Sequence, residues 1–112
     1  MKLNFKEMAE EIKPHFNGGE GVFNAKIIND GTNKILMGRL EKGNSIGLHT
    51  HTGTSEIIYV ISGVGTMLYD GGTEILTAGD VHYCPNGKAH SFRNENDEDL
   101  IFFAVIPTHE KN

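Results

Sequence analysis

The sequence predicts an all-β protein of a single domain, folded as a barrel or sandwich of short strands. Fourteen glycines in 112 residues recur between short apolar runs, which is typical of a turn-rich β protein. The runs follow one another at an even, short spacing, without a repeat, linker or low-complexity tract. A chain of this length buries about two thirds of its unfolded surface, enough for one core.

The N-terminal part predicts a short helix over residues 4–13. Asn4 can cap its first turn, and Glu7 stands at the matching capping-box position. Pro14 would end the helix. Four residues would form its apolar stripe: Phe5, Met8, Ala9 and Ile12. We therefore expect residues 1–20 to be an N-terminal helix and lead-in, and residues 21–108 to form the barrel.

From residue 22 onward, runs of β-forming residues alternate with turn residues. The clearest hairpin has its turn at 70–72, and an acidic turn at 95–99 precedes the last strand. Nine strands are expected, over residues 22–28, 34–40, 46–51, 56–61, 66–69, 73–77, 80–84, 90–94 and 100–106.

Charge and composition exclude several classes of partner. The net charge of −5 and the lack of a Lys/Arg cluster argue against nucleic acid. A small anion is still compatible, because a bound metal would set the local charge. The single cysteine, Cys84, allows no internal disulfide. No apolar stretch approaches ~20 residues and the N-terminus lacks a signal-like segment, so we expect a cytoplasmic protein without a membrane partner.

Three histidines and a glutamate form a candidate site for one divalent metal ion: His49, His51, Glu56 and His90. His49 and His51 are one residue apart, so on a strand both rings project from the same face. Glu56 and His90 each continue an inward apolar row of a strand. Burying these polar groups without partners would cost free energy of folding. A divalent cation removes this cost because it binds the neutral imidazoles and neutralises the carboxylate. Mn²⁺, Fe²⁺, Zn²⁺ and Ni²⁺ all stay open.

The two segments that carry these residues resemble the two motifs of the cupin superfamily. The first pattern, G-x5-H-x-H-x4-E-x6-G, is met by Gly43, His49, His51, Glu56 and Gly63. The second, G-x5-P-x-G-x2-H-x3-N, is met by Gly79, Pro85, Gly87, His90 and Asn94. The resemblance implies a jelly-roll barrel, or double-stranded β-helix, with a metal near one mouth and a small-molecule ligand inside. Asn94 is expected to tie down backbone.

Several residues near the motifs have two interpretations. Arg39 could anchor a carboxylate, but Leu36, Gly38 and Leu40 form the better inward row, which favours an outward Arg39. His82 and Cys84 share one face of a strand and could lie behind the metal ligands, although filling the strand is the favoured interpretation.

The resemblance leaves two kinds of function open, because this fold hosts many activities. One is metal-dependent turnover of a small anionic or enolisable molecule, by a dioxygenase-like or decarboxylase-like reaction. Glu56 separates the chain from thiol dioxygenases, which lack that glutamate. Glu74 and the acidic residues 97–99 are candidate acid/base groups, although nothing in the sequence places them at the mouth. The alternative is a non-catalytic cupin that binds or senses a small molecule or metal.

Outward apolar residues predict a homodimer, which is also the usual cupin arrangement. Ile57, Tyr59 and Ile61 share the face of their strand opposite to Glu56 and would stay uncovered in a single barrel.

Overall fold

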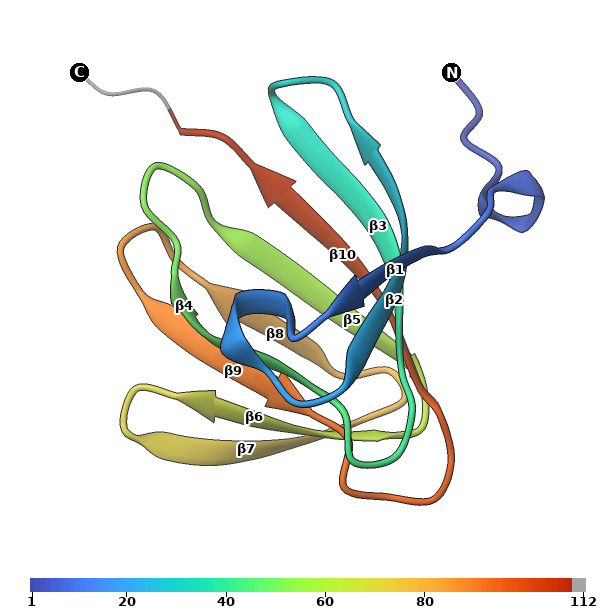
Figure 1. The fold of residues 1–112 in the computed structure, drawn as a ribbon. Helices are drawn as coiled ribbons and strands as arrows, with labels where there is room; N and C mark the ends of the chain where they lie inside the picture. Colours follow the sequence, from blue (N-terminus) through green and yellow to red (C-terminus); the bar gives the residue numbers. More distant parts are fainter. Residues whose placement is uncertain (110–112) are drawn as a thin grey trace.

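The fold consists of two antiparallel sheets that lie face to face, as the computed structural model of the chain shows for residues 1–109 (Figure 1). The larger sheet has the strand order β1-β2-β3-β10-β5-β8 and the smaller one β4-β9-β6-β7. In the described part of the chain the strands are β1 (Glu11–Pro14), β2 (Val22–Asn29), β3 (Asn33–Leu40), β4 (Ser45–Thr50), β5 (Glu56–Ser62), β6 (Val64–Tyr69), β7 (Gly72–Thr77), β8 (Val81–Cys84), β9 (Ala89–Arg93) and β10 (Leu100–Pro107). Short 3-10 turns occupy η1 (Phe5–Glu7) and η2 (Phe16–Gly18).

The jelly-roll class and all nine expected strands are confirmed, each within two residues of its expected bounds. The core fills the space between the sheets, where the rings of Phe23 and Phe102 stack 5.9 Å apart. Gly38 faces these rings, and a Cβ at this position would collide with both. The inward row of Leu36, Gly38 and Leu40 is thereby confirmed.

The helix expected over residues 4–13 is wrong beyond its first turn. Asn4 does cap η1, since its side chain accepts a hydrogen bond from the backbone N–H of Lys6 (3.1 Å). Met8 is already extended, and β1 pairs antiparallel with β2 along the edge of the larger sheet. A ten-residue helix is marginal alone, and the unpaired edge of β2 offers a full set of hydrogen bonds instead. Pro14 is tolerated because β1 is an edge strand.

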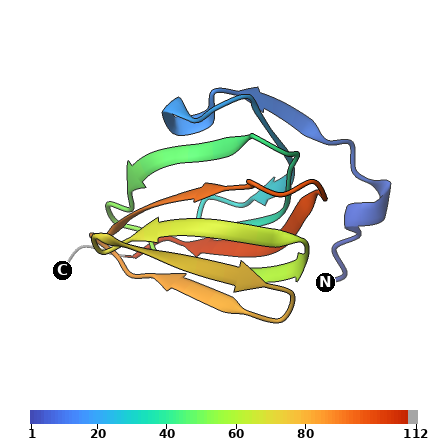
Figure 2. The same cartoon turned by 90° about the horizontal axis from the view of Figure 1, so that it is seen from below.

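Residues 11–19, which we call the N-terminal strap, run from the edge of the larger sheet across to β4. Figure 2 shows η2 lying over β4. The backbones meet so closely that a Cβ on Gly47 would collide with the carbonyl oxygen of Asn17. A Cβ on Gly19 would likewise collide with the carbonyl oxygen of Ser45. Glycine at both positions lets the strap dock directly on the strand that carries His49.

No helix within residues 1–109 has both the length and the apolar character needed to cross a membrane.

Candidate metal centre

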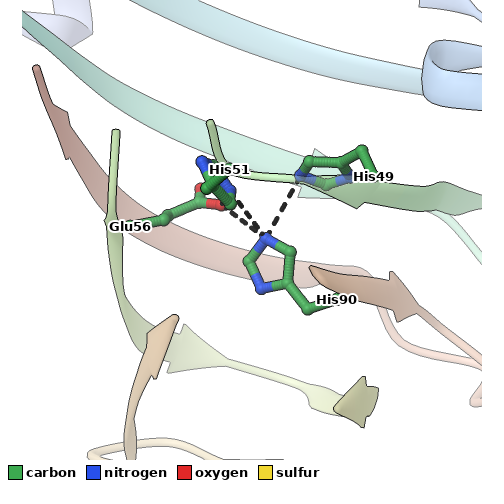
Figure 3. A group of neighbouring side chains, drawn as sticks. All are labelled: His49, His51, Glu56 and His90. Atoms are coloured by element: carbon green, nitrogen blue, oxygen red, sulfur yellow. Dashed lines mark hydrogen bonds and ion pairs between the residues drawn. The ribbon is translucent and has the colours of Figure 1, made fainter. Parts of the chain in front are cut away.

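The side chains of the four candidate ligands converge between the two sheets, from residues at or near the ends of their strands (Figure 3). His49 lies on β4 and is paired in register with His90 on β9, while His51 follows the end of β4. Glu56 is the first residue of β5 and reaches across from the larger sheet. The alternation expected for β5 is confirmed, since Glu56, Ile58 and Val60 are buried.

The ligand atoms meet around one nitrogen of His90. Its Nε2 lies 3.0 Å from His51 Nε2, 3.2 Å from His49 Nε2 and 2.8 Å from Glu56 Oε1. All four ligand atoms lie within 4.8 Å of one another, so the group is able to hold a metal ion. The fold therefore brings together the residues that the sequence singled out, from positions up to 41 residues apart.

The outer nitrogens of the two histidines from the first motif have partners of their own, which turn the Nε2 atoms towards the centre of the cluster. His49 Nδ1–H donates to the carbonyl oxygen of Gly47 (2.8 Å), so the proton of the neutral ring sits on Nδ1. His51 Nδ1 hydrogen-bonds with the hydroxyl of Thr54 (2.9 Å). Burial lowers the pKa of His49, which favours its neutral form. These are the features of imidazoles prepared to bind a metal.

Glu56 supplies the negative charge of the site. Burial opposes its ionisation, but the hydrogen bonds and charges of His51 and His90 outweigh burial and lower the pKa of Glu56 to about 2. The side chain is therefore a carboxylate at neutral pH although it is only 7% exposed. Three nitrogens and one carboxylate oxygen form a donor set suited to first-row divalent metals.

One side of the cluster opens into a cavity of about 720 Å³. His49, His51 and Glu56 line it, whereas His90 is almost fully buried. The wall of the cavity comes from β2, β3, β10 and the N-terminal strap. Its main apolar residues are Phe16, Phe23, Ile27, Leu36, Ile46 and Ile106.

His82 has a contact that the sequence did not favour. The expectation that it merely fills its strand is wrong, because its Nε2 lies 3.1 Å from His90 Nδ1 and its Nδ1 lies 2.9 Å from Glu74 Oε1.

Cys84 also lies close to the rings of His82 and His90. Burial raises the pKa of its thiol to about 11, and Sγ faces the carbonyl oxygen of Lys88, so it stays a neutral packing group.

The remaining charged candidates lie away from the cavity. Arg39 points outward and pairs with Glu10 (2.9 Å), Glu41 (3.1 Å) and Asp99 (3.3 Å), so it anchors neighbouring segments rather than a ligand. Glu74 faces His82.

Three other charged residues do line the cavity: Lys13 and Glu11 of the strap, and Lys34. The sequence missed the strap residues because the segment was expected to be helical.

The fold and the site define a small jelly-roll protein with a histidine–glutamate cluster inside. The family model described as the cupin domain matches residues 36–106, more than half of the chain, and the chain belongs to the cupin family. A protein of Thermotoga maritima named an oxalate-binding protein is 31% identical over 113 residues, covering 95% of this chain and 93% of that protein.

Two solved structures are similar to this chain over nearly all of its length. One, described as a predicted oxalate decarboxylase from Thermotoga maritima, has a TM-score of 0.90 and 30% identity, covering 96% of this chain and 99% of that one. The other, described as a putative sugar phosphate isomerase from Acidithiobacillus ferrooxidans, has a TM-score of 0.78 and 27% identity, covering 91% of this chain and 69% of that one.

Proposed function

We propose that this protein binds one divalent metal ion through His49, His51, Glu56 and His90, and holds a small carboxylate anion on that metal. The observation that carries the proposal is the convergence of three imidazole nitrogens and one carboxylate beside an open cavity. Four protein ligands leave coordination positions open on Mn²⁺, Fe²⁺ or Ni²⁺, while Zn²⁺ could close the site tetrahedrally.

The charge of the loaded site favours an anionic ligand. Neutral imidazoles and one carboxylate leave a divalent ion with a net charge of about +1. Lys13 and Lys34 add positive charge to the cavity wall, and Glu11, 3.8 Å from Lys13, offsets part of it. The curated relative and the solved structure from Thermotoga maritima are both named for oxalate, so a small dicarboxylate is the ligand class to test first.

The chemistry that follows binding has two forms. When bound, the metal polarises a carboxylate or enolate ligand, which supports decarboxylase-like or dioxygenase-like turnover. The protein holds the ligand and excludes bulk water with the apolar wall. The alternative is a cupin that binds or senses the anion without turning it over. It is favoured by the scarcity of acid/base groups, since Glu11 and Glu56 are the carboxylates of residues 1–109 that line the cavity.

The test begins with protein stripped of metal and reloaded separately with Mn²⁺, Fe²⁺, Zn²⁺ and Ni²⁺. We expect about one ion per chain by elemental analysis, and oxalate binding by calorimetry only in the loaded protein. The double variant His49→Ala/His51→Ala should lose the metal. Unchanged metal content in this variant would refute the assignment.

A second measurement separates the catalytic form from the alternative. Release of CO₂ or consumption of O₂ by the loaded protein with oxalate and other small carboxylates supports turnover. Tight binding of oxalate without CO₂ release or O₂ consumption supports the non-catalytic alternative.

We also propose a homodimer formed through the outer face of β5 and β8. Five apolar side chains there are between 42% and 58% exposed: Ile57, Tyr59, Ile61, Val81 and Tyr83. Such a contiguous patch is costly to leave in water. We expect a dimer by light scattering at micromolar concentration and a monomer for Tyr59→Lys. A monomeric wild-type protein would contradict the proposal.

A further inference from the structure

A chain of hydrogen bonds runs from the metal side of His90 to the surface. His90 on β9 contacts His82 on β8 through its Nδ1, the ring nitrogen that does not face the other ligands (3.1 Å). His82 in turn contacts Glu74 on β7 through its own Nδ1 (2.9 Å). His82 is buried, whereas the side chain of Glu74 is 44% exposed.

The carboxylate at the end of the chain fixes the direction of every proton in it. An ionised carboxylate only accepts, so His82 Nδ1–H donates to Glu74. A neutral His82 then has no proton on Nε2, which accepts the Nδ1–H of His90. In this tautomer the lone pair of His90 Nε2 faces the other ligand atoms, where a bound cation would take it up in place of the contact with Glu56 Oε1 (2.8 Å).

His90 differs in this respect from the other two histidines. The outer nitrogen of His49 donates to a backbone carbonyl and that of His51 meets a hydroxyl, both neutral groups. Only for His90, among the three histidines of the cluster, does the ring nitrogen that faces away from the other ligands lead to a charged group. His90 itself donates to neutral His82, and the bond from His82 to the Glu74 carboxylate is the charge-assisted one. A hydrogen bond to an ionised acceptor is roughly twice as strong as a neutral one, so it makes His82 Nε2 a better acceptor and, through it, His90 a better electron donor.

We propose that His82 and Glu74 are positioning residues of the metal centre, which hold His90 in the tautomer that presents Nε2 and strengthen it as a ligand. This inference rests on the proposed metal binding. It adds two residues outside the four ligands, one of them on the surface, whose substitution should change metal affinity.

The affinity for Zn²⁺, measured by competition with a chromogenic chelator, tests the proposal with graded variants. His82→Phe leaves the buried N–H of His90 without an acceptor, and we expect affinity to fall about 10- to 100-fold. His82→Gln restores an acceptor through its amide oxygen and should recover part of the loss. Glu74→Gln keeps the shape but removes the charge, and we expect a loss of about 3- to 10-fold.

Two control variants separate this effect from packing and from long-range charge. Cys84→Ala shortens a buried side chain on the same face of β8 and should leave affinity within about twofold of wild type. Glu98→Gln removes the same charge as Glu74→Gln from an exposed loop and should do likewise.

Nitrogen-15 spectra of the zinc-loaded protein supply a readout that packing alone would not change. We expect His82 as the Nδ1–H tautomer in the wild type. The Nε2–H tautomer of His82 would overturn the proposal.

The outcomes also separate this proposal from the one on which it rests. If the wild type binds no Zn²⁺, the metal site itself is refuted and this inference falls with it. If the wild type binds Zn²⁺ and Glu74→Gln binds it as tightly as the wild type, the metal site stands and the positioning role is refuted. An equal loss in Cys84→Ala would also refute it. Glu74 is partly exposed, so its variant decides the question even if His82→Phe does not fold.

Discussion

The buried carboxylate of Glu56 makes the stability of the metal-free protein depend on pH in a way that can be calculated. Its pKa is about 2 in the folded chain, against an ordinary value of 4.5. At about 1.4 kcal/mol per pKa unit, this gap stabilises the folded state by about 3 kcal/mol at neutral pH. Because the folded pKa is the lower one, the stabilisation is present above pH 4.5 and is lost as pH falls towards 2.

The Glu56→Gln variant isolates this contribution. We expect the metal-free wild type to exceed it by about 3 kcal/mol in unfolding free energy at pH 7, and by about 1 kcal/mol at pH 3. Urea unfolding followed by circular dichroism at a series of pH values measures the gap. The exposed Glu98→Gln is the control, with a difference from wild type within about 0.5 kcal/mol throughout. A gap for Glu56→Gln that stays constant from pH 7 to pH 3 would refute the reasoning.

Three further substitutions test the frame around the site. Asn94→Ala should lower the free energy of unfolding, measured by thermal unfolding, by about 2 to 4 kcal/mol. The buried amide donates to the carbonyl oxygen of Leu40 (2.8 Å), and its oxygen accepts from the backbone of the following loop. A loss below about 0.5 kcal/mol would contradict this role. Gly47→Ala should push Asn17 and the rest of the strap away from β4, which would appear as faster amide exchange in residues 15–19 with the exchange of the core unchanged; exchange equal to that of the wild type would contradict the close contact. Lys13→Ala should weaken oxalate binding to the loaded protein without changing metal content; undiminished affinity would remove this lysine from the ligand site.

Strand positions and the residues that come together in the candidate site could be predicted because both depend on local patterns. The alternation along β5 placed Glu56 in the row of Ile58 and Val60, and the turn residues marked the ends of the strands. Asn94 has the role expected of it, since its amide donates to backbone carbonyl oxygens of Leu40 and Glu98.

What the sequence could not predict depends on contacts between distant segments. Residues 11–14 have a helix-like apolar spacing, but pairing with β2 decides their conformation, and no local pattern reports the free edge of that strand. The contact between His82 and His90 likewise depends on how two strands from different sheets approach each other. Glu74 was singled out as a possible acid or base, and only the fold shows that it faces a histidine.

Because of the N-terminal strap, one wall of the cavity and the four candidate ligands come from separate stretches of chain. The ligands lie within residues 49–90, whereas Lys13, Phe16 and Asn17 of the strap supply one wall of the cavity. Close backbone contacts at Gly47 and at Gly19 join the strap to the strand that carries His49. Changes in strap side chains can therefore alter the size and charge of the cavity while the four candidate ligands stay the same.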